Sequence, residues 1–370
     1  MKTATIFIKN NTEAAIATAK YLDTCLLEET IKKLKKAEVD KIYLVGLDKD
    51  YDDVTIKKNI EEVIETIEGH SGKSLLVSPL YPNIKEYHYQ ALLNEDTGVV
   101  LCNNNEIIHA FMIENRYFAD FENIKYKALN VEDSCKRKIN SLEELQAYAK
   151  DVRMNINRKH LNNGVVIMDI EDTYIGKDVV IGKGTTIYPN VYIEGETRIG
   201  EGCSITPASH LINATIGNNT KIIASRIDSS TVGNNVSIGP NSHLRGNSQV
   251  DDNVRIGNFV EFKNTKFGMG SKCAHLTYLG DSTIGKNVNI GCGVVTVNYD
   301  GVHKFPTVIK DNAFIGSNAN IIAPVTVGEY AVIAAGSTVT EDVPDRDMAI
   351  ARARQINKEG YGYKYIKKEK

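Results

Sequence analysis

The chain has 370 residues, of which 42% are hydrophobic and 25% are charged, and its formal net charge is −3. This length allows two domains, and the composition is ordinary for a folded protein with a sizeable core. A slightly acidic chain does not favour general nucleic-acid binding, because phosphate backbones call for a basic surface. The basic tail, residues 364–370, is too short to change this, so we expect no nucleic-acid partner.

Membrane insertion and secretion are also disfavoured. No stretch approaches the length of a membrane span, and the opening MKTATIFIKNNTEAA turns polar too early for a signal peptide. The cysteines show neither CxxC nor Cys/His metal spacing; they are Cys25, Cys102, Cys135, Cys203, Cys273 and Cys292. We therefore expect a cytoplasmic protein with free thiols and no metal site.

The first part of the chain alternates helical and β-type patterns. The expected elements are an amphipathic helix over Leu26–Lys36, a strand over Ile42–Leu47, a charged helix over Ile56–Ile67, strands over Ser74–Val77 and Val99–Cys102, and a helix over Ser141–Arg153. Ser141 and Glu144 form a capping-box pattern at the start of the last helix. Such alternation predicts an α/β layer fold with a mainly parallel sheet.

A nucleotide-binding domain of this class needs a glycine-rich turn after its first strand. Here TATIFIKN is followed by NTEAAIATAKY, which contains no glycine. The segment Gly69–Ser74 (GHSGKS) resembles the end of a phosphate loop, but the full spacing is missing and the glycines precede a strand. We interpret it as a plain loop.

The segment Asn155–Gly164 (NINRKHLNNG) lacks the Gly/Ser or Pro content of a flexible linker, so we interpret it as a junction. The expected organisation is an α/β domain over residues 1–160, a repeat domain over 161–350 and a C-terminal tail over 351–370.

From residue 175 onward an aliphatic residue recurs every six positions. The series is Ile175, Ile181, Ile187, Ile193, Ile199, Ile205; then Ile216, Ile222; Val232, Ile238, Leu244, Val250, Ile256, Phe262; Ile284, Ile290, Thr296; and Ile309, Ile315, Ile321, Val327, Ile333, Val339. This period fits neither a helix nor an alternating strand, and it predicts a parallel β-helix of hexapeptide repeats. The repeated residues should form one buried ladder, because a single coil has no core.

The residue after each aliphatic position is expected at a tight corner, where Gly or Asn tolerates a left-handed backbone. Glycines at this place are Gly176, Gly182 and Gly200, and the asparagines that fit the corner chemistry are Asn218, Asn219, Asn234, Asn235, Asn253, Asn287 and Asn312.

Two segments interrupt the period: 272–281 (KCAHLTYLGD) and 298–304 (NYDGVHK). A regular ladder does not need them, and loops on a rigid scaffold commonly carry binding groups.

These interruptions belong to a longer resemblance. The motifs HLRGN, GNFVEFKN, KCAHLTYLGD, NVNIGCG, VNYDGVHKF, FIGSNANIIAPV and IARARQINKEGY follow one another over residues 239–361, about a third of the chain. They resemble the acetyltransferase half of the bifunctional bacterial GlmU family, which makes UDP-N-acetylglucosamine. In that family a left-handed β-helix acetylates glucosamine-1-phosphate, and an N-terminal domain then uridylylates the product.

The resemblance implies acetyl-CoA as co-substrate and gives His275 the role of general base, with Glu261 orienting its imidazole. An imidazole suits this task, because an attacking amine must lose a proton near neutral pH. Acetyl transfer to an amine needs no metal. Cys292 is expected to offer small packing or backbone contacts rather than a nucleophile, and His243 and His303 match no family role.

The implied substrate-binding residues are Arg245, Lys263, Tyr278, Asn289, Asn298 and Lys304. The implied acetyl-CoA-binding residues are Cys292, Tyr299, Ser317, Ala335 and Arg352. Fixed cations fit a phosphorylated sugar, and Ser317 is a candidate to steady the charge on the tetrahedral intermediate. The alternative for Arg245 and Lys263 is an ordinary surface charge, and for Asn289 a plain corner residue.

The first domain resembles the family's uridylyltransferase domain only in remnants, among them LEETIKKLKKAEVDKIYLVG and SLLVSPLYPN. The expected acidic metal ligand corresponds to Ser78, and Asn140 corresponds to the other metal-binding position. About a hundred residues of the family's domain have no counterpart. The resemblance thus implies a degenerate nucleotidyltransferase-like domain without uridylyltransferase activity.

The leading hypothesis is a glucosamine-1-phosphate N-acetyltransferase that forms a homotrimer with active sites between subunits. Two alternatives remain open: acetyl transfer to another amino-sugar phosphate, and a non-catalytic regulatory or scaffolding relative.

Overall fold

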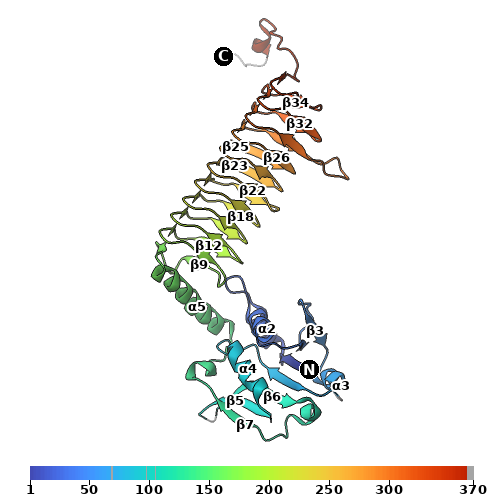
Figure 1. Ribbon diagram of the computed structural model, residues 1–370, viewed down its shortest axis with the longest axis vertical. Coiled ribbons are helices and arrows are strands. Elements are labelled where there is room, and N and C mark those ends of the chain that lie inside the picture. The colour runs from blue at the N-terminus through green and yellow to red at the C-terminus, as the bar shows by residue number, and fades with distance from the viewer. Residues whose placement is uncertain (68–69, 97, 105, 365–370) are drawn as a thin grey trace. The chain divides into compact units, whose positions relative to one another are not determined.

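The computed structural model describes residues 1–67, 70–96, 98–104 and 106–364 (Figure 1). Gly69 of the loop considered above and residues 365–370 of the tail lie outside the described residues. The chain divides into two compact units, Met1–Val152 and Arg153–Lys370, and each is described by itself. Helix α5 (Leu142–Asn162) crosses this division, and the expected boundary near residue 160 falls within the same helix.

The described residues of the first unit form a seven-stranded sheet in the order β3-β2-β1-β4-β6-β5-β7. The strands are β1 (Lys2–Phe7), β2 (Lys41–Val45), β3 (Val54–Lys57), β4 (Lys73–Val77), β5 (Val99–Asn103), β6 (Glu106–Glu114) and β7 (Lys127–Asn130). Strand β6 runs antiparallel to β4 and β5, whereas the other neighbours are parallel. The predicted α/β fold with a mainly parallel sheet is confirmed.

The remaining helices of this unit are α1 (Asn11–Thr18), α2 (Leu26–Lys36), α3 (Ile60–Ile67), α4 (Glu86–Asn94) and the short 3₁₀ turns η1 (Asn115–Asp120) and η2 (Asp133–Lys136). Helix α2 has the predicted bounds, because Leu27, Ile31 and Leu34 recur at helical spacing and are all buried. The helix expected from Ile56 begins only at Ile60, since residues 54–57 pair with β2 as a strand.

Helix α5 begins where expected, with the Ser141 Oγ accepting a hydrogen bond from the Glu144 amide at 3.1 Å. It then continues through most of the segment that we interpreted as a junction, so this segment is helical and is not a flexible linker. The physical reason is local: no Gly or Pro interrupts the chain before Gly164, which follows the helix with a φ of +85°. The buried Asn157 amide donates to the carbonyls of Ile170 and Thr173, which fixes the helix end to the first coil.

The second unit is a parallel β-helix, whose stacked coils are visible in Figure 1. The first stack contains β8 (Val166–Ile167), β11 (Thr186–Ile187), β14 (Ser204–Ile205), β17 (Lys221–Ile222), β20 (Ser237–Ile238), β27 (Asn289–Ile290), β30 (Phe314–Ile315), β33 (Val332–Ile333) and β35 (Met348–Ala349). The second contains β9 (Thr173–Ile175), β12 (Val191–Glu194), β15 (His210–Ile212), β18 (Arg226–Asp228), β21 (His243–Arg245), β28 (Val295–Val297), β31 (Asn320–Ile322) and β34 (Thr338–Val339).

The third stack contains β10 (Val180–Ile181), β13 (Arg198–Ile199), β16 (Thr215–Ile216), β19 (Thr231–Val232), β22 (Gln249–Val250), β24 (Lys266–Phe267), β26 (Ser282–Ile284), β29 (Thr307–Ile309) and β32 (Val325–Val327). Strands β23 (Arg255–Lys263) and β25 (Lys272–Gly280) pair with the first stack at their start and with the second at their end. A short 3₁₀ turn, η3 (Tyr361–Lys364), follows the coils. The architecture is consistent with the left-handed β-helix that the resemblance implies.

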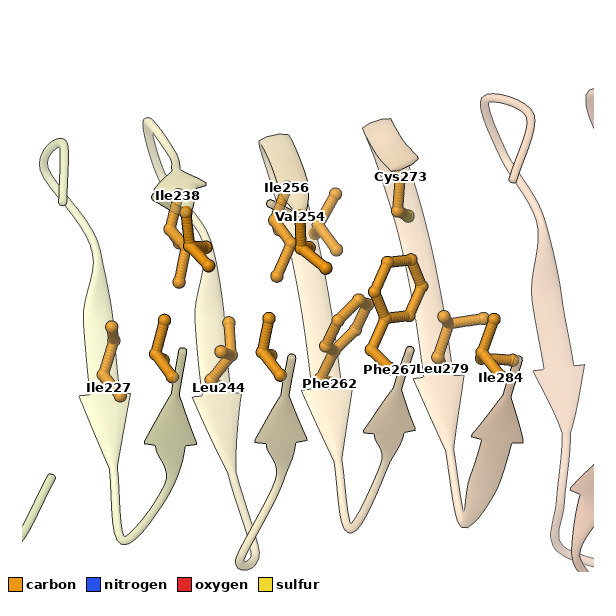
Figure 2. Close-up of a cluster of buried hydrophobic side chains, with 14 of the residues drawn as sticks. Ile227, Ile238, Leu244, Val254, Ile256, Phe262, Phe267, Cys273, Leu279 and Ile284 are labelled. Atoms are coloured by element: carbon orange, nitrogen blue, oxygen red, sulfur yellow. The ribbon is translucent and has the colours of Figure 1, made fainter. Parts of the chain in front are cut away.

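The residues of the six-residue period are buried, as predicted, and all of them except Thr296 belong to one continuous hydrophobic core. Figure 2 shows Ile227, Leu244, Phe262 and Leu279 lined up on successive coils, each pointing into the interior. The ladder is therefore built from equivalent positions one coil apart, which is how a solenoid obtains a core.

The corner chemistry is confirmed for five of the asparagines, because Asn219, Asn235, Asn253, Asn287 and Asn312 have φ values between +54° and +61°. Asn218 and Asn234 differ: their side-chain oxygens accept backbone hydrogen bonds from the preceding coil.

The glycines that follow the aliphatic residues have another role than the one predicted. Neither Gly182 nor Gly200 has a positive φ. A Cβ atom on Gly182 would lie 2.6 Å from the backbone of Gly200 in the next coil. Close approach of the coils, rather than a left-handed backbone, requires glycine there.

Among the described residues, none of the helices combines the length and the apolar character needed to cross a membrane. The six cysteines are free, as expected.

Candidate functional site

Two adjacent strands of the β-helix depart from the usual coil. Strands β23 and β25 run through the corner between the first and second stacks, with Asn258 of β23 in register with His275 of β25. Phe259 and Leu276 follow, with φ values of +57° and +37°, and their side chains are 60% and 61% exposed. A bulky residue in the left-handed region is strained, and such strain commonly marks functional sites.

Beyond this corner the second stack carries a group of charged side chains. Arg245 of β21 is in register with Lys263 of β23, and Glu261 is in register with Tyr278 of β25. The Arg245 guanidinium contacts Glu261 Oε1 twice, from Nε at 2.7 Å and from a terminal nitrogen at 2.6 Å. The parallel register thus places residues from three coils on one outward face.

Lys304 reaches the same place from the loop that follows β28. This loop is a small hairpin, closed by an antiparallel β-bridge between Tyr299 and Lys304. Within it, the Asp300 carboxylate accepts hydrogen bonds from the Val302 and His303 amides. The Lys304 amine comes close enough to Lys263 to lower the Lys263 pKa, because the two ammonium groups compete for the same space and repel each other. Two neighbouring ammonium groups repel each other, and an anion between them would relieve that repulsion.

A polar group lies next to the lysines. Asn298 is 7% exposed and donates through Nδ2 to Asp281 at 2.5 Å. A Cβ atom on Gly280 would lie 2.5 Å from the Tyr278 hydroxyl and 2.8 Å from Asn298 Nδ2, so glycine leaves room for both side chains. Burial, followed by the charge of Glu261, raises the Tyr278 pKa, which keeps its hydroxyl protonated as a donor.

Asp281 is a functional candidate that sequence reasoning left without a role. Its two oxygens accept from Asn298 and from Asn264, so it orients the buried amide that faces the site. In the sequence, Asp281 is the last residue of the first interrupting segment, 272–281. That position alone gave it no role, because the role of a carboxylate among cations depends on which groups it contacts.

Four of the five expected acetyl-CoA residues share one edge of the prism. Backbone hydrogen bonds run from Gly293 to Leu276, from Asn318 to Cys292 and from Gly336 to Ser317. A Cβ atom on Gly316 would lie 2.5 Å from the Ala335 nitrogen, and one on Gly336 would lie 3.7 Å from Arg352 Cδ. We call the set Cys292, Ser317, Ala335 and Arg352 the corner column.

All four side chains of the corner column are exposed, and Leu276 continues their line into the preceding coil. His275 is exposed immediately beside that residue. The structure therefore brings His275 to the end of the corner column. Tyr299, 56% exposed, lies apart from this column on the hairpin loop.

The expected pairing of Glu261 with His275 is not seen within the chain. Glu261 contacts Arg245, and among the described residues the His275 side chain makes no hydrogen bond or ion pair. His275 precedes Tyr278, the register partner of Glu261, by three positions, and this corresponds to about 10 Å along a strand. The role given to Glu261 stays a prediction.

Asn289 is also separate from the other sugar-binding candidates. It lies on β27 in the first stack, where Lys272 and Phe314 are its register partners. The corner column lies between this face and the face with Arg245 and Lys263. A convex edge separates the two faces, so one chain alone does not gather all the candidates around one ligand.

One group of residues among those described has the composition of a metal site: His88, Glu132 and Cys135. Its hydrogen bonds argue against that use. His88 Nδ1 accepts the Lys85 amide at 3.0 Å, which leaves the ring proton on Nε2, and Nε2 faces Glu132 at 3.0 Å. A metal-bound histidine normally donates through its second nitrogen. We interpret the group as a structural contact between α4 and η2.

The geometry defines the class of protein first: a hexapeptide-repeat β-helix with a cationic face beside an exposed histidine. Residues 171–211, 229–264 and 306–341 match the family model described as bacterial transferase hexapeptide (six repeats).

Curated relatives then give the particular resemblance. The chain is 53% identical over 236 residues to the bifunctional protein GlmU of Geobacillus sp. (strain WCH70), covering 64% of this chain and 51% of that protein. It is 52% identical over 231 residues to the bifunctional protein GlmU of Clostridioides difficile (strain 630), and the match covers 62% of this chain and 50% of that protein. These relatives confirm the GlmU resemblance over the matched part, and the chain spans about half the length of each.

Among solved structures, Rv0371c from Mycobacterium tuberculosis H37Rv is 11% identical and covers 40% of this chain and 95% of its own, with a TM-score of 0.34. This likeness is too weak to carry an argument.

Proposed function

We propose that the protein transfers the acetyl group of acetyl-CoA to the amine of glucosamine-1-phosphate. The observation that carries this proposal is the cationic face: Arg245 and Lys263 are in register on adjacent strands, and Lys304 is near enough to lower the Lys263 pKa. Such a group suits a sugar phosphate, because phosphate oxygens accept hydrogen bonds from several fixed cations. The hexapeptide transferase match and the GlmU relatives support the acetyl-transfer part.

In the proposed reaction His275 takes a proton from the amino group as its nitrogen attacks the thioester carbonyl carbon. A C–N bond forms, and the carbonyl electrons move to oxygen, where hydrogen-bond donors such as Ser317 would stabilise the negative charge. Collapse of this intermediate breaks the C–S bond and expels the thiolate of CoA. The thiolate recovers a proton, so that the products are the amide and free CoA. No metal takes part in these steps.

We further propose that the active site forms between subunits of a homotrimer. The convex edge described above supports this, because Asn289 and the cationic face look outward from different faces of one prism. A neighbouring subunit placed against the edge would close a concave site that one chain lacks. Exposed Phe259 and Leu276 at that edge would then be covered.

Thiol release from acetyl-CoA, measured with a panel of amino-sugar phosphates, tests the reaction. We expect the highest kcat/KM with glucosamine-1-phosphate. A higher value with another amino-sugar phosphate would establish the alternative acceptor. Release with none of them would favour the regulatory or scaffolding alternative.

The Lys263→Met variant tests the role of the cationic face. We expect kcat/KM for glucosamine-1-phosphate to fall about 10- to 100-fold, because a charge-assisted phosphate contact is lost. Slow acetylation of unphosphorylated glucosamine should be unchanged, since it makes no such contact. Lys266→Met, on the neighbouring third stack, is the matched control. If Lys263→Met lowers kcat/KM equally for glucosamine-1-phosphate and for glucosamine, Lys263 does not bind the phosphate.

For the first unit we propose that uridylyltransferase activity is absent. Ser78 stands at the end of β4 where the resemblance calls for an acidic metal ligand, and Asn140 is exposed and bonded to Glu144. A serine hydroxyl alone is a poor Mg²⁺ ligand. Pure protein given UTP, Mg²⁺ and N-acetylglucosamine-1-phosphate should form no UDP-N-acetylglucosamine above the rate without protein. Formation of that product would contradict this proposal.

A further inference from the structure

The first unit contains a pocket that the proposed acetyl transfer does not use. Its volume is about 330 Å³, within the range of small-molecule sites. The aromatic side chains that line it are Phe7, Tyr81, His109, Phe111 and Phe121. Tyr81 and His109 are stacked, with ring centres 5.9 Å apart and an interplanar angle of 28°. These walls favour a flat, largely apolar group, because rings gain contact area and stacking energy there.

The pocket lies where the sheet topology favours ligand binding. From β1 the chain adds β2 and β3 on one side of the sheet and then returns to add β4 on the other side of β1. The order in which strands are added therefore reverses between the parallel strands β1 and β4. Phe7 ends β1, and Val77 and Ser78 lie at the end of β4; all three line the pocket. Open α/β sheets bind ligands outside the carboxyl ends of their strands at such a reversal.

Two lysines and two glutamates are the charged residues that line the pocket. Lys9 and Lys138 line it, and among the described residues neither amine is in an ion pair or a side-chain hydrogen bond. All four line the pocket together with His109, whose pKa is lowered first by burial and then by the charges of Lys9 and Lys138, against a smaller opposite effect of Glu13. An anionic group would satisfy both amines at this end of the aromatic walls.

The acidic side chains of the pocket do not form a cation site. Glu13 Oε2 accepts the Lys9 backbone amide at 2.9 Å, within the N-terminal cap of α1, and Glu122 is exposed. No metal-compatible group of residues is found there within the described part of the chain. A polyphosphate with its Mg²⁺ therefore finds no carboxylate cluster in this pocket.

We propose that this pocket binds a small ligand with a flat apolar ring and a single anionic group, without a divalent cation. The ring lies between the aromatic walls, and the anion contacts Lys9 and Lys138. This inference concerns the first unit alone and is independent of the acetyl-transfer proposal.

Indole-3-acetate and its uncharged analogue indole-3-acetamide are suitable probes. The chain contains no tryptophan, so probe fluorescence can be followed without an indole background from the protein. With the full chain we expect saturable binding of indole-3-acetate, at least about fivefold tighter than of the amide, because one ion-pair contact contributes roughly 1 kcal/mol. Added Mg²⁺ should not strengthen binding.

Lys138→Met should weaken indole-3-acetate binding about fivefold and leave the amide unchanged. The matched control is Lys136→Met, because the Lys136 amine pairs with Asp133 and Glu106 instead of lining the pocket. Both side chains are half-buried rather than part of the core, so the fold should survive. Three results would overturn the proposal: no saturable binding, equal affinity for acid and amide, or tighter competing binding by UTP with Mg²⁺.

Discussion

Replacing His275 by alanine is expected to lower kcat for acetyl transfer about 10²- to 10⁴-fold, the usual contribution of a general base. The side chain is exposed at the end of the corner column, where an acetyl group carried along that column would arrive. KM for the phosphorylated sugar should change little, because the cationic face is untouched. Stopped or continuous thiol-release assays across pH provide the measurement.

His210→Ala is the control for this result, since His210 lies on the same β-helix and pairs with Glu194, away from the candidate site. An unchanged kcat in the His275→Ala protein would show that another group removes the proton. Glu261→Gln separates two roles for the carboxylate. A kcat loss with a shifted pH profile would fit orientation of His275, whereas a rise in KM alone would fit its observed contact with Arg245.

Replacing Phe262 by alanine is expected to cost about 3–5 kcal/mol in the free energy of unfolding, because a buried ring leaves a cavity. Phe262 is fully buried, and its ring lies 4.9 Å from that of Phe267 (Figure 2). Each coil is stabilised chiefly by its two neighbours, so the cavity weakens contacts on both sides. Urea denaturation followed by far-ultraviolet circular dichroism measures the loss.

Phe259→Ala is the matched control, since this residue lies on the same strand but is 60% exposed. It should cost much less in a single chain, because its ring contributes little to the core. Sedimentation of both variants shows whether their assembly has changed. If both variants keep the oligomeric size of the unmodified protein and lose equal free energy of unfolding, Phe262 does not point inward and Phe259 outward on β23 as described.

Much of the fold could be predicted because it depends on short-range periodicity. The six-residue series from Ile175 to Val339 identified residues that are all buried, since each coil repeats the same environment. It left out Leu211, Ile227, Phe267, Cys273 and Leu279, which are buried in the same core where the period shifts. In the first unit, α2 has its predicted bounds, but β6 was missed and the start of α3 was placed too early. Those errors come from strands, whose pairing partners lie far away in the sequence.

The candidate site was named from a resemblance, and the structure gives part of it a physical basis. Arg245, Lys263, Tyr278, Asn298 and Lys304 are brought together by register and by the hairpin loop. Asn289 is on another face, and Glu261 contacts Arg245 instead of His275.

By itself the sequence determined the β-helix, the α/β character of the first unit and the places where the repeat is interrupted, because all three are local patterns of side-chain type. Only the tertiary structure decided that β23 and β25 pass through a strained corner, that Lys304 comes near Lys263, and that two lysines line an aromatic pocket at the ends of β1 and β4. These features join residues from different coils or strands, and the relevant distances depend on register and chain reversal, which no local pattern encodes.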